Sequence, residues 1–151
     1  MIQKNNIVVI ARILLGTIFI VSGIEKLLSP YQNFLYVIQN YEVIGPPWDE
    51  ITAKFFPWLE FLSGLFCFLG LWLRQALTGA LVLLTVFIGV VGQALIRQLP
   101  IVECGCFGSL FSIPLEAVLV MDSSLWLLSS WLLSRIPQAS RFSLDEYFGT
   151  K

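Results

Sequence analysis

The sequence predicts an all-α integral membrane protein, a bundle of four spanning helices, and composition and hydropathy pattern are the observations behind it. Of the 151 residues, 57% are hydrophobic and 13% are charged, and the mean hydropathy is +0.82. Soluble domains carry roughly 25% charged residues, so this chain is too apolar for that class. Four runs also approach the roughly 20 apolar residues that cross a bilayer as a helix. The length suits a single domain over residues 1–151.

The predicted spans are residues 7–28, 55–73, 76–96 and 114–133, followed by a polar tail over 135–151. The first span carries Arg12 near its start, and it lacks the small-residue cleavage site that a signal peptide would need. Pro57 and Pro114 are placed near the starts of the second and fourth spans, where a missing N–H costs little. Only Arg74-Gln75 separates the second span from the third, which predicts a tight antiparallel hairpin of helices.

The segment Ser29–Lys54 is expected to form a polar loop between the first two spans, with a turn at Gly45-Pro46-Pro47. Within it, apolar residues recur at helical spacing over Tyr31–Tyr41. This spacing predicts a short amphipathic helix lying at the membrane interface.

The distribution of basic residues predicts the orientation of the chain. Six of the nine lysines and arginines fall on the side of the termini, and the other three are Lys26, Lys54 and Arg97. Because cytoplasmic loops carry the excess of basic residues, both termini are expected in the cytoplasm. The long loop and the loop before the fourth span then face outward. The expected location is a bacterial inner membrane, with those loops in the periplasm.

Charged residues inside the predicted spans are expected to face the bundle interior, because a charge at membrane depth is costly. Asp122 lies about 12 Å into the fourth span at about 1.5 Å per residue, near mid-membrane. Helical spacing puts further polar and glycine residues on shared faces, where glycines let helices approach closely. These faces are Arg12, Gly16, Phe19, Gly23 and Lys26 in the first span; Glu60, Gly64 and Cys67 in the second; and Gly89, Gln93 and Arg97 in the third.

The expected result is a polar cluster in the outer half of the bundle, formed by Lys26, Glu60, Gln93, Arg97 and Asp122. It suits proton handling or binding of a quinone. One structural alternative is that Glu25, Lys26 and Arg97 extend to the lipid headgroups. Another is that Glu60 locks the bundle through an ion pair with Lys26 or Arg97. Cys67 is interpreted as a small buried apolar side chain.

Two thiols, Cys104 and Cys106, lie one residue apart in a short break before the fourth span. The chain has no histidine, which disfavours a zinc site, so no metal is expected. A disulfide between them would close a very short ring and stabilise little as a permanent cross-link. An outward-facing strained pair favours redox exchange instead, and an inert pair of thiols stays open as the alternative. One pair exchanges two electrons, so turnover needs a second redox partner, either a membrane quinone or a protein dithiol.

Three segments of the chain, which include the two thiols and several of the charged residues above, resemble those of known families. The stretch Phe56–Gly64 is similar to the Leu-Pro-Trp-Leu-Glu-x-x-x-Gly segment of the methylamine-utilisation MauE family, and Cys104–Gly108 is similar to its Cys-Gly-Cys-Phe-Gly loop. Gly23–Lys26 resembles the Gly-x-x-Lys signature of DoxX-type proteins. Asp122 falls where the last span of the family often has Arg-Asp, but Met121 replaces that arginine.

The resemblance implies a four-helix membrane bundle, similar in outline to vitamin K epoxide reductase. It implies that Cys104 and Cys106 are the redox pair and that Lys26, Glu60 and Asp122 occupy the polar positions of the family. Gly105 and Gly108 by themselves suit a tight turn around the thiols, and Phe107 is expected to anchor this loop to the bundle. The resemblance also implies a role in forming the disulfides of a partner enzyme, together with a thioredoxin-like protein on the outer face.

Three functions follow from these observations. The leading hypothesis is an integral-membrane thiol–disulfide oxidoreductase that exchanges electrons between an outer protein and a quinone. The second is a non-catalytic anchor or assembly subunit for a partner enzyme, and the third is a carrier of small molecules that uses Asp122 and Arg97. Nucleic-acid binding is not expected, because the net charge is −1 and no basic patch is present.

Overall fold

Four long apolar helices and two short ones make up the described chain. The computed structural model describes residues 2–98 and 114–139. The helices are α1 (Ile2–Leu28), α2 (Tyr31–Asn40), α3 (Trp48–Leu69), α4 (Leu73–Ile96), α5 (Leu115–Ser134) and α6 (Ile136–Ala139). The part of α1 from Asn6 onward and the whole of α3, α4 and α5 are long and apolar enough to cross a membrane. The prediction of a helical membrane bundle is therefore confirmed, and the protein is a multi-pass membrane protein.

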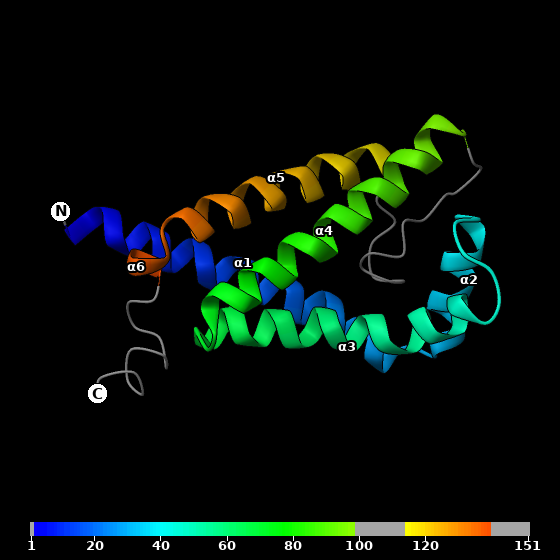
Figure 1. Cartoon of the computed structure of the whole chain (residues 1–151), viewed down its shortest axis with the longest axis horizontal. Coiled ribbons are helices and arrows are strands. Elements are labelled where there is room, and N and C mark those ends of the chain that lie inside the picture. The colour runs from blue at the N-terminus through cyan, green and yellow to red at the C-terminus, as the bar shows by residue number, and fades with distance from the viewer. Residues whose placement is uncertain (1, 99–113, 140–151) are drawn as a thin grey trace.

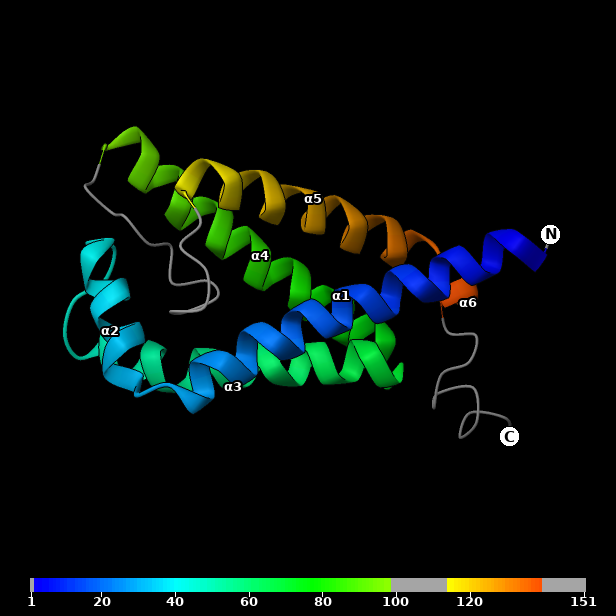
Figure 2. The ribbon, with the colours of Figure 1, turned by 180° about the vertical axis from the view of Figure 1, so that it is seen from behind.

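The long helices alternate in direction and form two antiparallel pairs, α1 with α3 and α4 with α5 (Figure 1). The start of α1, the turn between α3 and α4, and α6 lie at one end of the bundle. The view from behind shows α2 at the opposite end, beside the end of α4 and the start of α5 (Figure 2). This end, called the α2 end below, contains the buried residues Lys26, Glu60 and Asp122.

The pair α1 and α3 packs backbone against backbone, because glycines line their seam. A Cβ atom added to Gly16 would lie 2.7 Å from the backbone nitrogen of Phe68, and one added to Gly64 would lie 2.7 Å from that of Ile20. Gly23 has the same clearance, 2.7 Å, to the backbone nitrogen of Phe61. Small residues allow this approach in membranes, where van der Waals packing drives helix association. The predicted glycine faces of the first two spans are confirmed.

The second span begins earlier than predicted. Its helix α3 starts at Trp48, so the segment up to Lys54 that was expected as loop is helical and Pro57 lies inside the helix. Hydropathy predicts only the apolar part of a helix that crosses a membrane. The helix itself can begin earlier, and here it begins at Trp48, directly after Pro47. Pro57 is tolerated because packed neighbours accommodate proline within spanning helices. The predicted short helix after the first span is confirmed as α2, which ends at Asn40 with Tyr41 as its cap, and its position at a membrane interface stays a prediction.

The hairpin between the second and third spans turns at a different place from the predicted one. Gly70 adopts a φ of 69°, a left-handed conformation that favours glycine, and it ends α3. Arg74 and Gln75, which were expected to form the turn, lie in the first turn of α4. The backbone freedom of glycine, and not the charge at Arg74, determines where the helix stops.

Candidate functional site

A buried ion pair joins α1 to α3 near the α2 end. The Nζ of Lys26 lies 2.7 Å from the Oε2 of Glu60, and the two side chains are 2% and 5% exposed. Lys26 also donates to the hydroxyl of Ser22 at 2.9 Å, and that hydroxyl donates to Oε1 of Glu60 at 2.8 Å. Both carboxylate oxygens of Glu60 are therefore hydrogen-bonded. A buried ion pair is tolerated only when its remaining polar atoms are satisfied in this way.

Aromatic rings complete the surroundings of the lysine. Its Nζ lies 5.6 Å from the ring centroid of Phe34 on α2 and 5.3 Å from that of Phe87 on α4. The face of an aromatic ring carries negative partial charge and attracts a cation. Lys26 thus contacts groups from α1, α2, α3 and α4. The expectation that it extends to the headgroups is wrong, because it is 4% exposed.

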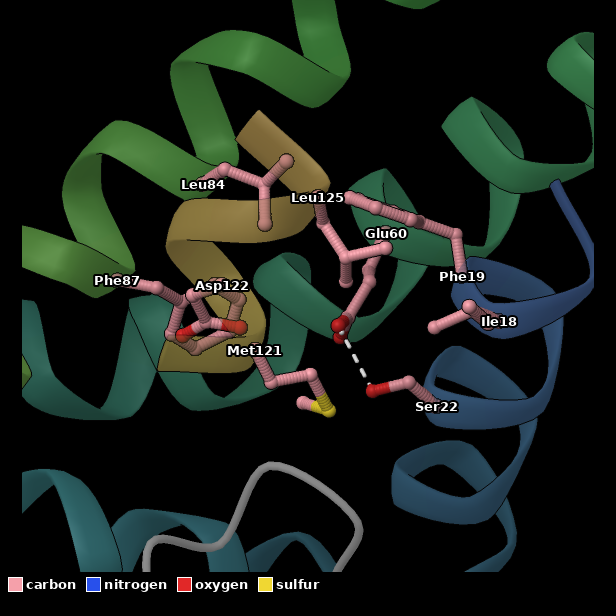
Figure 3. Close-up of a pocket in the computed structure, with 9 residues that line it drawn as sticks. All are labelled: Ile18, Phe19, Ser22, Glu60, Leu84, Phe87, Met121, Asp122 and Leu125. Atoms are coloured by element: carbon pink, nitrogen blue, oxygen red, sulfur yellow. Dashed lines mark hydrogen bonds between the residues drawn. The ribbon is translucent and has the colours of Figure 1, made fainter. Parts of the chain in front are cut away.

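Asp122 on α5 lies beside this network, across a small cavity (Figure 3). The cavity has a volume of about 20 Å³, enough for one water molecule. Ser22, Glu60 and Asp122 supply its polar groups, and Phe87 and Met121 are among its apolar walls. Asp122 is 4% exposed and experiences the charges of both Lys26 and Glu60. Its Oδ2 has no hydrogen-bond partner within residues 2–98 and 114–139. Asp122 therefore keeps an oxygen that can accept a hydrogen bond, whereas both oxygens of Glu60 are already bound.

Tyr41, the cap residue of α2, is buried at the same end of the bundle. Its side chain is 6% exposed and packs with Val91, Leu115 and Val118 of α4 and α5. Burial raises the pKa of Tyr41 to about 12, and the charge of Asp122 adds to the increase. The hydroxyl therefore keeps its proton at any physiological pH and stays a hydrogen-bond donor.

Two members of the predicted cluster lie outside it. Arg97 is 47% exposed in its side chain and forms a loose pair with Glu42, with its Nη2 3.8 Å from Oε2. Gln93 is half-buried and Gly89 is exposed, with open space where its Cβ would be. The prediction that this face of the third span turns inward is wrong. Buried small and apolar residues such as Ala80, Leu84 and Val91 form the inner face of α4 instead.

The other predicted site residues lie outside the described part of the chain. They are Cys104, Gly105, Cys106, Phe107 and Gly108. Connectivity places the two anchor points of their segment, the end of α4 and the start of α5, at the α2 end (Figure 2). The described residues contain no group of three or more metal-ligating side chains.

Sequence reasoning missed Ser22 and Asp49. Ser22 precedes Lys26 by one helical turn on the same face, so the spacing that identified the lysine also applies to it. Asp49 is 1% exposed and accepts a hydrogen bond from Nε2 of Gln39 at 2.8 Å, which ties α2 to the first turn of α3. Its burial depends on how α2 folds back, and no local pattern signals that contact.

The opposite end of the bundle buries a cation in a different way. Arg12 is 2% exposed, and its Nη1 donates to the carbonyl oxygen of Ala139 in α6 at 2.6 Å. Cys67 is 1% exposed in the apolar core of the same end, as predicted for a small buried side chain.

Comparison with known proteins identifies the family. Neither a curated protein nor a solved structure matches the chain significantly. The resemblances to DoxX-type proteins and to vitamin K epoxide reductase therefore stay predictions. One family model matches residues 4–135, which is most of the chain and includes all four spanning helices. The chain belongs to the family described as methylamine utilisation protein MauE.

Proposed function

We propose that this protein is a membrane thiol–disulfide oxidoreductase that supports disulfide formation in a partner enzyme. Cys104 and Cys106 are the redox pair, and both termini lie in the cytoplasm of a bacterial inner membrane. Their disulfide oxidises a thioredoxin-like or substrate protein on the periplasmic side. The family description names methylamine utilisation as the process in which such a partner enzyme would act.

The observation that carries the proposal is the buried polar network at the α2 end. Lys26, Ser22 and Glu60 are held together at membrane depth, and Asp122 lies next to them with an oxygen that no described residue binds. The segment with the two cysteines is attached at this same end. Charged side chains inside a membrane usually mark a pathway for protons or substrates.

The chemistry requires a membrane oxidant, and a lipid-soluble quinone meets that requirement. As the S–S bond of Cys104 and Cys106 forms, the dithiol gives up two electrons and two protons. The quinone takes up both pairs and becomes a hydroquinone. Thiol–disulfide exchange with the partner's dithiol then returns the two cysteines to thiols and leaves the partner oxidised.

The test uses a Cys67→Ala background, so that Cys104 and Cys106 are the remaining thiols. A bulky maleimide that cannot cross membranes is added to cells before and after reduction. We expect labelling from the periplasmic side only after reduction, and loss of partner oxidation in the Cys104→Ser and Cys106→Ser variants. If the double Ser variant still supports partner oxidation, or if the pair never forms a disulfide, the proposal is wrong.

The same variants separate this function from a non-catalytic anchor. An anchor would recruit its partner and sustain full partner activity in the double Ser variant. If the protein is an oxidoreductase, the double Ser variant should still recruit the partner, but the cysteines of the partner should stay reduced.

A further inference from the structure

A large apolar chamber lies between α2, α3 and α4, next to the polar network. Its volume is about 330 Å³, within the roughly 300–1,000 Å³ typical of small-molecule sites. Phe34 and Tyr41 come from α2, Thr52 and Phe56 from α3, and Phe87 from α4. Valine and isoleucine side chains supply the other walls, so an occupant must be mostly apolar.

We propose that this chamber binds the ring of a lipid-soluble quinone, beside the carboxyl group of Asp122. This assignment rests on the proposed function, because it names the site of the membrane oxidant.

The walls suit a flat ring. Phe56 and Phe87 pack edge to face with ring centroids 5.2 Å apart and an interplanar angle of 88°, and Phe34 is tilted against Phe56 at 6.4 Å. The three rings that line the chamber are therefore tilted at different angles to one another. Aromatic rings prefer offset-stacked or edge-to-face neighbours. A quinone ring can form such contacts with these side chains, whereas an acyl chain has no ring to stack.

The chamber adjoins the small cavity that contains Asp122, with Phe87 between the two spaces. Phe87 lines both the chamber and the small cavity that contains Asp122, and Figure 3 shows Phe87 and Asp122 together on one side of that cavity. Tyr41, on the chamber wall, is close enough to experience the charge of Asp122. Reduction of a quinone to a hydroquinone requires two protons at its oxygens. A buried carboxyl group with an unbound oxygen can relay these protons. Binding of an acyl chain involves no proton transfer and would not require such a group.

The chamber also lies near the attachment of the thiol segment. Glu42 follows Tyr41 directly, and it pairs with Arg97 at the end of α4. The end of α4, after which the segment with Cys104 follows in the sequence, therefore lies near the chamber wall.

Photolabelling of the full-length protein in lipid nanodiscs tests the site directly. The probe is an azido derivative of decylbenzoquinone, and labelled peptides are mapped by mass spectrometry. We expect labelling on α2 and α4, and at least a tenfold loss in Val90→Trp, which fills the chamber. Val86→Trp, at a half-exposed wall position, gives a second test if the first variant folds poorly. Val82→Trp is the matched control, because Val82 lies on α4 and is 58% exposed outside the chamber.

Two results would overturn the site. Labelling that persists in both Val90→Trp and Val86→Trp would place the quinone elsewhere. Labelling displaced as well by decane as by unlabelled decylbenzoquinone would identify the chamber as an acyl-chain site. The double Ser variant of Cys104 and Cys106 should bind the probe normally. If that variant binds while the wild-type cysteines never form a disulfide, the site is supported and the proposed oxidoreductase function fails separately.

Discussion

Arg12 and Lys26 lie on one face of α1, about 21 Å apart at about 1.5 Å per residue, and both are buried. The Arg12 end bonds its cation to a backbone carbonyl of α6 within an apolar core. The α2 end pairs its cation with Glu60, places Asp122 nearby and leaves both a small cavity and a large chamber. The same helices therefore form a packed end and an end with room for a ligand. Burial of a charge alone does not distinguish a structural residue from a functional one.

The largest expected effect comes from breaking the buried ion pair. Lys26→Met leaves Glu60 buried without its cation, and we expect the free energy of unfolding to fall by about 3–5 kcal/mol. Thermal and denaturant unfolding in detergent, followed by circular dichroism, measures this change. Replacing both partners, as Lys26→Met with Glu60→Leu, should recover most of the loss because no unpaired charge remains.

The exposed pair of Lys54 and Glu50 is the matched control for that prediction. Its charged atoms are 3.7 Å apart and its side chains are 50% and 57% exposed. Lys54→Met should therefore change stability by less than about 1 kcal/mol. Equal effects of Lys26→Met and Lys54→Met would show that the buried pair does not hold α1 to α3.

At the packed end, Arg12→Met should lower stability by about 1.5–3 kcal/mol, because it removes a charged donor from the carbonyl of Ala139. The same unfolding measurement applies. Quinone photolabelling and disulfide formation should not change in the folded protein. A loss of labelling in Arg12→Met at temperatures where the helical signal is intact would contradict the division between the two ends.

The glycine seam passes through both ends and should respond to a single methyl group. Gly64→Ala forces the new Cβ against the backbone of Ile20, and we expect a loss of about 1–3 kcal/mol. Gly89→Ala on α4 is the control, since nothing lies within 4 Å of its added Cβ. The control should gain up to about 1 kcal/mol through helix propensity. Similar effects at both glycines would rule out the close approach of α1 and α3.

Asp122→Asn should have the smallest effect on stability and a large effect on activity. The amide keeps the shape of the carboxyl group and removes a buried ionisable group, so stability should change by less than about 1 kcal/mol. Reduction of decylubiquinone by the dithiol form should slow by about 100-fold or more, because Asn cannot transfer protons as a carboxyl group does. Absorbance of the quinone monitors the reaction.

Ser123→Ala is the control for Asp122→Asn. Ser123 is the next residue on α5, and its hydroxyl donates to the carbonyl of Leu119 within the same helix. This variant should keep full activity. A normal rate of quinone reduction in Asp122→Asn would remove Asp122 from the proton pathway and leave it a structural residue.

Hydropathy and helical spacing predicted the four spans, the short helix α2 and the inward faces of α1 and α3. These properties are local, because each depends on residues one or two turns apart on one helix. The same reasoning was wrong for Gly89, Gln93 and Arg97. Spacing shows that three residues share a face of a helix, but it does not show which way that face turns.

Composition and periodicity by themselves determined that this chain is a helical membrane protein with charged residues on two inward faces. The reason is that a bilayer forces each span to satisfy its own backbone and to hide its charges. Only the tertiary structure decided that Lys26 forms its ion pair with Glu60, that Arg97 lies outside the buried polar network, and that α2 encloses a chamber beside Asp122. These contacts join residues far apart in the sequence, and they depend on how closely the glycines let α1 and α3 approach.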